Sequence, residues 1–356
     1  MLRLEARQTA SRLMSALSPV IAVAITVLVA AALFVALGRD PVRGLAVFLV
    51  EPLANRYALT ELALKATPLV LCAIGLSLCF RANVWNIGAE GQFLLGAIAG
   101  GGVALWATVN VGVLPRPALV PLVLVAGMLG GAGWAAITAL LRDRFNANEI
   151  LVSLMLVYVA QLLLSYLVFG PWKDPQGYNF PQTRSFDAAA MLPLLVPQSR
   201  LHVGALIALA LVAATWVLMF RTFAGFQLQV GGVAPLAARY AGFPARRALW
   251  SAMLLSGGFA GLAGAMEAAG PLGQLTPNVS TGYGFTAIIV AFVGRLHPVG
   301  CVLSGLLLSM FVIGGELSQS RLGLPSALTG VFEGLLLFSL LACDTLVHYR
   351  VRFGRG

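Results

Sequence analysis

The sequence predicts an all-α, polytopic membrane protein with about ten transmembrane helices. Of its 356 residues, 59% are hydrophobic and only 10% are charged, and the mean hydropathy is +0.91. Soluble domains carry about 25% charged residues, so this chain has too few of them to cover a surface that faces water. Nearly uncharged stretches of membrane-spanning length also recur along the whole chain. Lipid is therefore the expected solvent for most of the surface.

Each span is predicted from its length, because a bilayer core of about 30 Å requires about 20 apolar residues per helix. The first run, from Leu13 to Gly38, is too long for the apolar part of a signal peptide, so we expect a retained helix. The second span contains Lys65, and the eighth is short. The predicted spans are residues 18–38, 58–80, 91–110, 118–141, 150–170, 201–220, 248–269, 284–296, 299–316 and 327–343.

These spans form one predicted transmembrane domain, residues 18–343, between an N-terminal tail (1–17) and a basic C-terminal tail (344–356). The net charge is +10, but the arginines stand singly between apolar runs, which argues against nucleic acid as a partner. Their bias toward one set of connecting segments follows the positive-inside rule and places both termini in the cytoplasm. We expect a multi-pass protein of a bacterial inner membrane, in contact with lipid.

The clearest orientation signal is the segment 221–247. It carries Arg221, Arg239, Arg246 and Arg247 but no acidic residue, so we expect it on the cytoplasmic side. The polar, proline-rich stretch 171–200 is expected on the opposite side of the membrane.

Glycine pairs predict how tightly the spans pack. A G-x-x-x-G spacing inside an apolar helix lets two backbones approach closely, because no side chain separates them. Four such pairs lie inside predicted spans and indicate a tightly packed bundle: Gly96 with Gly100, Gly127 with Gly131, Gly257 with Gly261, and Gly330 with Gly334.

Several chemistries are not predicted for this chain. A phosphate-binding loop ends in Gly-Lys-Ser/Thr, and neither lysine of the sequence, Lys65 or Lys173, follows a glycine. The histidines stand alone, which predicts neither a metal site nor a catalytic triad, and the cysteines show no metal-ligand spacing. We therefore expect no bound cofactor, no metal, no catalytic residues and no enzymatic activity in this chain.

The segment 81–92 concentrates polar residues between two apolar spans. Asn86, Glu90 and Gln92 lie there beside two glycines, Gly88 and Gly91, which are expected to break a helix. Amides and a carboxylate at membrane depth need partners or a water-filled cavity, so this pattern predicts an interrupted helix that lines a solute pathway. A simple cytoplasmic turn is the alternative.

Other acidic residues lie within or at the end of predicted spans. Glu267, Glu316 and Glu333 are each expected to make a helix contact or to lie at the interface. Glu333 has the most apolar surroundings of the three, so it is also a candidate for the pathway.

A short helix is predicted within the basic segment. Pro235 suits the first position of a helix, and Gly242 with Pro244 ends it. This helix is expected either to lie on the membrane surface, attracted to anionic lipid, or to dock into a groove of a partner protein.

These segments resemble the permeases of ABC importers in the branched-chain amino acid and simple-sugar permease superfamily. The resemblance rests on residues 83–92 (NVWNIGAEGQ), 235–242 (PLAARYAG) and 282–298 (GYGFTAIIVAFVGRLHP) and spans residues 58–340. The first segment, with Asn148 and the Leu-Met-Leu run 154–156, is most similar to the nucleoside (guanosine-type) branch. Two departures are Ala234, where relatives carry a polar residue before the coupling proline, and Val157, where many carry asparagine.

The resemblance implies a subunit that pairs with a second, similar permease. It also implies ATP-binding cassette subunits inside, which hold ATP and Mg, and a substrate-binding protein or lipoprotein outside. By this resemblance, the short helix corresponds to the coupling helix, which lies in a cleft of the ATPase subunit. The residues carried over to that role are Pro235, Ala237, Ala238, Arg239, Tyr240 and Gly242.

The predicted function is nucleoside import by alternating access, powered by separate ATPase subunits. Asn86, Glu90 and Gln92 are expected to contact the hydroxyls and base edges of the solute, with Trp85 available for stacking. A simple sugar or a branched-chain amino acid is the alternative cargo. A proton-coupled secondary transporter that uses Glu90 or Glu333 as the proton carrier is the alternative mechanism.

Overall fold

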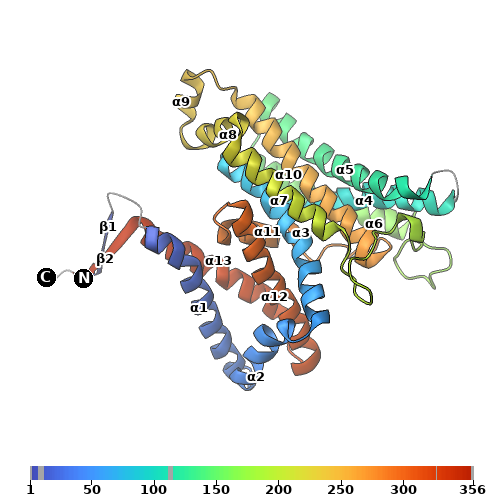
Figure 1. The fold of residues 1–356 in the computed structure, drawn as a ribbon, viewed down its shortest axis with the longest axis horizontal. Coiled ribbons are helices and arrows are strands. Elements are labelled where there is room, and N and C mark those ends of the chain that lie inside the picture. Colours follow the sequence, from blue (N-terminus) through green and yellow to red (C-terminus); the bar gives the residue numbers. More distant parts are fainter. Residues whose placement is uncertain (1, 7–11, 111–114, 326, 354–356) are drawn as a thin grey trace. The chain divides into compact units, whose positions relative to one another are not determined.

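The computed structural model describes residues 2–6, 12–110, 115–325 and 327–353, and it is almost entirely helical (Figure 1). In these ranges, eight helices are long and apolar enough to cross a membrane, and two shorter apolar helices accompany them. Together they coincide with the ten predicted spans, so the all-α polytopic fold is confirmed. The span with Lys65 is α3 (Arg56–Arg81), and the short eighth span is α11 (Tyr283–Val293).

The chain divides into two compact units, residues 1–62 with 307–356, and residues 63–306. In the first unit, two short strands lie side by side as an antiparallel pair. They are β1 (Leu2–Ala6) and β2 (Tyr349–Phe353). The sequence analysis predicted neither strand. The helical elements of this unit are α1 (Arg12–Ala36), α2 (Pro41–Leu45), a π turn (Ala46–Val50), a 3-10 turn (Glu51–Leu53), the start of α3, most of α12 (Pro298–Leu322) and α13 (Ala327–His348).

An aromatic cluster forms the core of the first unit. Phe332 of α13 meets Phe34 of α1 edge-on at 5.9 Å between ring centroids, and Phe48 at 4.9 Å. The glycine pair of α13 does not pack closely: a Cβ atom built at Gly330 or Gly334 would have no neighbour within 4 Å. The prediction of close helix packing at this glycine pair is wrong, because the spacing does not decide which face of a helix is covered.

The second unit carries the remaining helices. They are the main part of α3, α4 (Ala89–Val109), α5 (Arg116–Phe145), α6 (Glu149–Phe169), a 3-10 turn (Ala188–Ala190), α7 (Gly204–Arg221), α8 (Phe223–Val233), α9 (Pro235–Tyr240), α10 (Ala245–Glu267), a π turn (Ala268–Leu272) and α11. Helix α8, which begins where the Thr222 hydroxyl accepts from the Gly225 amide at 3.1 Å, was not predicted.

Helix α10 packs against both α4 and α5, and this three-helix contact is the densest part of the second unit (Figure 1). Glycine makes it possible: a Cβ atom at Gly96 of α4 would lie 2.1 Å from the carbonyl oxygen of Gly261, and one at Gly131 of α5 would lie 2.2 Å from that of Gly257. No side chain fits in such gaps. Close packing is therefore confirmed for the three glycine pairs of α4, α5 and α10.

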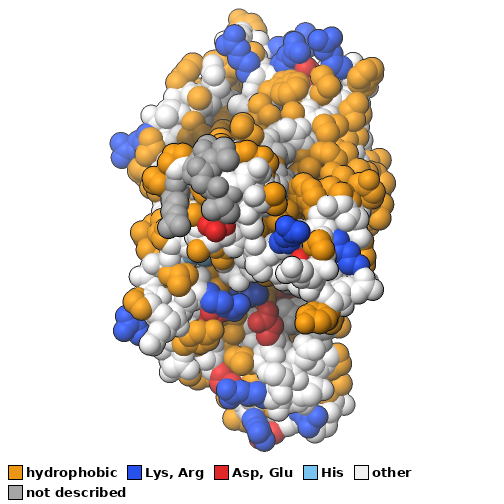
Figure 2. Space-filling view, turned by 90° about the vertical axis from the view of Figure 1, so that its right-hand side faces the viewer, with side chains coloured by type: hydrophobic (Ala, Val, Ile, Leu, Met, Phe, Trp, Pro, Cys, Tyr) orange, Lys and Arg blue, Asp and Glu red, His pale blue; other side chains and the backbone are white. Residues whose placement is uncertain are grey.

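The outer helices expose apolar side chains. Large side chains such as Leu129 of α5 and Leu162 of α6 are 62% and 71% exposed. Figure 2 shows apolar side chains over much of the face in view, with lysine and arginine in small separate groups. Exposed apolar area of this extent fits a lipid environment.

Candidate functional site

The predicted interruption lies between α3 and α4. Helix α3 ends at Arg81, α4 begins at Ala89, and residues 82–88 form a non-helical junction. Asn83 has a positive φ of 55°, which turns the chain sharply after α3. Gly88 is the N-cap of α4, but Gly91 lies inside the helix, so only the first of the two glycines marks the break.

Two side-chain amides, those of Asn86 and Gln92, hydrogen-bond each other inside the junction. The Nδ2 atom of Asn86 donates to Oε1 of Gln92 at 2.9 Å, and Nε2 of Gln92 donates back to Oδ1 of Asn86 at 3.0 Å. The same Asn86 amide also donates to the Ser256 hydroxyl of α10 at 3.0 Å, and its Oδ1 accepts from the Gly88 amide at 3.0 Å. Asn86 is fully buried. Both amides are thus engaged by the chain itself and fix the junction against α10.

Glu90 caps a second helix. Its Oε2 accepts from the backbone amide of Gly284 at 2.7 Å, in the first turn of α11, and its carboxylate also hydrogen-bonds the Ser280 side chain. A carboxylate at a helix N-terminus is stabilised by the helix dipole. Gly284 allows this approach, since a Cβ atom there would lie 2.2 Å from the Glu90 nitrogen. The helix beginnings of α4 and α11 are therefore tied together, in the manner of broken helices that line transporter pathways.

A further polar cluster, formed by Tyr283, Glu267 and Lys65, adjoins this junction, and the sequence analysis did not predict that these side chains meet. The Tyr283 hydroxyl donates to Oε1 of Glu267 at 3.4 Å, and Nζ of Lys65 lies 6.0 Å from the centre of the Tyr283 ring. Glu267 makes the contact between helical elements that was expected of it. The sequence feature that could have predicted this cluster is the presence of one lysine and one glutamate in otherwise apolar spans. Charged side chains are unfavourable in lipid unless they meet polar partners.

Trp85 and Glu333, the other predicted pathway residues, do not take part in the amide pair. Trp85 is 39% exposed, its indole nitrogen donates to Oδ1 of Asn83 at 3.2 Å, and its ring lies against Phe80. Glu333 is partly exposed on α13, in the first unit, whereas the other four residues belong to the second. No solute contact is tested for any of the five, so their roles stay predictions.

The predicted short helix is confirmed as α9. Gly242 ends it with φ of 75°, and the Phe243 amide donates to the Ala238 carbonyl at 2.9 Å, as in a glycine-terminated helix. Ala234 supplies no side-chain hydrogen bond at the other end, as its identity predicted. Among the residues carried over for coupling, Ala238 is buried. The others are exposed: Pro235, Ala237, Arg239, Tyr240 and Gly242.

Helix α9 presents apolar side chains to the surroundings. Leu236 is 84% exposed and Tyr240 is 96% exposed. A six-residue helix with one uncapped end has little stability of its own. This surface therefore suits contact with another macromolecule.

Two histidines lie at helix ends of the second unit. His202 is almost fully buried, and its Nδ1 accepts from the Gly204 amide at 3.1 Å; burial lowers the pKa of its imidazole to about 4. His297 precedes α12, and partial burial, with the Arg81 charge nearby, lowers the pKa of its imidazole.

The sequence is similar to known permeases over nearly its whole length. It is 39% identical to the glucose ABC transporter permease protein TsgB13 of Haloferax volcanii, over 98% of this chain and 93% of that protein. It is 29% identical to the guanosine ABC transporter permease protein NupP of Bacillus subtilis, over 97% of each chain. The nucleoside ABC transporter permease protein NupB of Lactococcus lactis is 26% identical, over 90% of this chain and 89% of that one.

Weaker matches include NupQ and TsgC13, permeases from the same two organisms as NupP and TsgB13. Among solved structures, PsaBC from Streptococcus pneumoniae in complex with Fab aligns with 83% of this chain and 92% of that chain, with a TM-score of 0.44 and 11% identity. The family described as branched-chain amino acid transport system / permease component matches residues 58–341. This chain therefore belongs to that family and is a multi-pass membrane permease of the ABC importer type.

Proposed function

We propose that this chain forms one half of a solute pathway and receives its driving energy from a separate ATPase subunit that docks on α9. The observation that carries the proposal is the exposure of Leu236 and Tyr240 on a short, uncapped helix. Closure of the ATPase subunits then pushes α9 and, through the directly following α10, changes the access of the junction to either side of the membrane.

The proposed orientation places α9 and both termini in the cytoplasm of a bacterial cell. The segment 221–247, with four arginines and no acidic residue, supports this orientation through the positive-inside rule. The occurrence of relatives in pairs, NupP with NupQ and TsgB13 with TsgC13, supports a second permease subunit as partner. ATP and Mg belong to the ATPase subunits, and a substrate-binding protein delivers the solute from outside.

The proposed solute carries a sugar ring. The sequence analysis predicted a nucleoside, and two of the relatives are named as nucleoside or guanosine permeases. The relative named as a glucose permease is more similar to this chain than either of them, at 39% identity, which favours a simple sugar. The carboxylates of Glu90 and Glu267 and the hydroxyl of Tyr283 are suited to hydroxyl groups, which both solutes have.

Coupling is tested in the assembled complex with Arg239→Glu combined with Ala237→Trp. Both side chains are exposed, so the double variant should assemble normally. ATP hydrolysis should persist while uptake falls, because the new charge and bulk disturb the docking of α9. Arg184→Glu, an exposed charge reversal in the 171–203 loop, is the control and should leave uptake unchanged. Retained coupling in the double variant contradicts the proposed docking role.

The solute is tested by uptake of radiolabelled glucose and guanosine at equal permease levels. Glu90→Ala should reduce uptake, and Glu90→Gln, which keeps an acceptor for the Gly284 amide, separates helix capping from solute contact. Unchanged uptake in both variants removes Glu90 from the pathway. Uptake that is abolished by a protonophore but survives ATP depletion would instead identify a proton-coupled transporter.

A further inference from the structure

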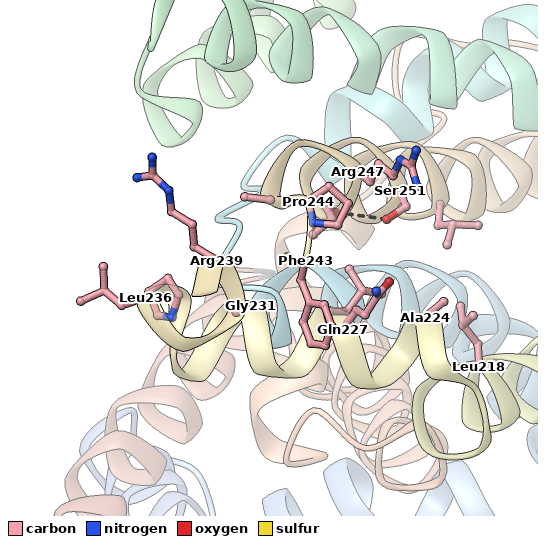
Figure 3. Close-up of a pocket in the computed structure, with 16 residues that line it drawn as sticks. Leu218, Ala224, Gln227, Gly231, Leu236, Arg239, Phe243, Pro244, Arg247 and Ser251 are labelled. Atoms are coloured by element: carbon pink, nitrogen blue, oxygen red, sulfur yellow. Dashed lines mark hydrogen bonds between the residues drawn. The ribbon is translucent and has the colours of Figure 1, made fainter. Parts of the chain in front are cut away.

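A groove of about 690 Å³ runs between α8 and α10 in the second unit (Figure 3). Phe243 and Gln227 lie within it, between the two helices (Figure 3). The two walls are formed by residues that recur every three or four positions along each helix: Ala224, Leu228 and Gly231 on α8, and Ala248, Ser251 and Leu255 on α10. These walls are almost entirely apolar.

The length of the groove matches one leaflet of a bilayer. Leu255 lies ten residues beyond Ala245, the first residue of α10. At 1.5 Å per residue this is about 15 Å, and half of the hydrocarbon core is also about 15 Å. The groove thus extends from the end of a membrane-spanning helix to about the depth that a single acyl chain reaches.

Two unpaired positive charges lie at the shallow end. Arg239 and Arg247 line the groove, both are exposed, and neither side chain forms a hydrogen bond or an ion pair with any residue in the described ranges. The neighbouring Arg246 is outside the groove and is paired with Asp143 at 2.7 Å. Because the segment 221–247 has no acidic residue, the chain itself supplies no counter-charge within it.

We propose that this groove binds an anionic phospholipid, with an acyl chain between α8 and α10 and the phosphate at Arg239 and Arg247. A peptide segment from a partner protein is the other possible occupant. Its backbone amides and carbonyls would lose water without gaining partners, since Gln227 and Ser251 are the polar side chains of the walls and Ser251 already donates to the Ala248 carbonyl. An acyl chain has no such groups, so the lipid fits this lining better.

The lipid would act beside the coupling surface. Arg239 belongs to α9, and Tyr240, its neighbour in sequence, does not line the groove. Leu236 of α9 also lines the groove, so lipid contact and partner docking would meet at Leu236 and Arg239. An anionic lipid would hold α9 against α10 and leave the side chain of Tyr240 exposed for the ATPase subunit.

The test uses the full-length purified permease in neutral detergent and native mass spectrometry with dioleoylphosphatidylglycerol or dioleoylphosphatidylcholine. Each arginine near an anionic headgroup contributes about fivefold to binding, so Arg239→Gln with Arg247→Gln should weaken phosphatidylglycerol binding by about 30-fold. Ser251→Trp, which fills the groove without changing its charge, should abolish retention of this lipid.

Arg246→Gln is the matched control, since it removes a charge from the same helix outside the groove and should retain the lipid. Circular dichroism and size-exclusion chromatography establish that each variant is folded. Equal binding of the two lipids to the wild type, or lipid retention that survives both the double arginine variant and Ser251→Trp, overturns the proposal. Cross-linking of Ser251→Cys to an ATPase subunit in the assembled complex would assign the groove to the partner instead.

Discussion

The junction between α3 and α4 and the loop around α9 are both breaks in the helical bundle. They differ in whether their polar groups find partners within the chain. At the junction, Asn86 and Gln92 satisfy one another, and Glu90 caps α11. At α9, the N-terminal end has no cap, and Tyr240 is almost fully exposed. The junction is stabilised by contacts within the chain, whereas α9 retains surface for other molecules.

The largest expected effect tests the close packing that supports the junction. Gly96→Val places a side chain where the Gly261 carbonyl lies 2.1 Å from a Cβ atom, so α4 and α10 must separate. We expect a loss of more than about 4 kcal/mol in stability and little folded protein. The amount of monodisperse full-length protein in detergent measures this. Gly133→Val on α5, where a Cβ atom has no neighbour within 4 Å, is the control; equal yields of the two variants contradict the prediction.

The second prediction breaks the amide pair. Asn86→Ala leaves the buried groups of Gln92 and Ser256 without their partner, with an expected loss of about 3 kcal/mol. Thermal unfolding of the purified permease measures the effect. In a double-mutant cycle, Gln92→Ala should be much less harmful when Asn86 is already alanine. Additive effects of the two substitutions would show that the pair does not act as a unit.

The third prediction concerns His202, another buried polar group that the chain satisfies itself. Its folded-state pKa of about 4 lies below the unfolded value near 6.5, so the unfolded chain binds more protons between these values. Its stabilisation is complete above about pH 6.5 and is lost as the pH falls toward 4. We expect a loss of about 2 kcal/mol between pH 7 and pH 5 from this group.

The pH dependence of thermal unfolding tests the role of this group. His202→Gln cannot titrate and should show a smaller decrease over the same pH range. An equal decrease in wild type and variant would assign the effect to other groups.

The smallest expected effect sharpens the contrast at α9. Ala234→Asn introduces the missing N-cap and should stabilise the helix by about 1 kcal/mol. Slower hydrogen exchange of the amides at 236–238 in the isolated permease measures the gain. Ala237→Asn, inside the same helix, adds the same side chain where it cannot cap and should speed exchange. If Ala234→Asn leaves exchange unchanged, α9 is already held by contacts other than its own cap.

Most of the helical architecture could be predicted, but the partners of the site could not. The spans follow from local apolar runs, and α9 follows from Pro235 and Gly242. Helix α8 was missed because its start depends on a single side-chain cap at Thr222. The partner of Asn86 on α10, Ser256, is 170 residues away in the chain, and the Gly284 amide that Glu90 binds is 194 residues away. No local pattern encodes such distances.

The sequence by itself determined where this protein crosses the membrane, because a run of apolar residues long enough for the bilayer is favourable in lipid whatever its neighbours are. It also determined the ends of α9, since proline and glycine act on their own backbone. The tertiary structure alone decided which glycine pairs are buried and which polar side chains meet. Both depend on the faces that two helices present to each other, and helix rotation and pairing are set by the packing of the whole bundle.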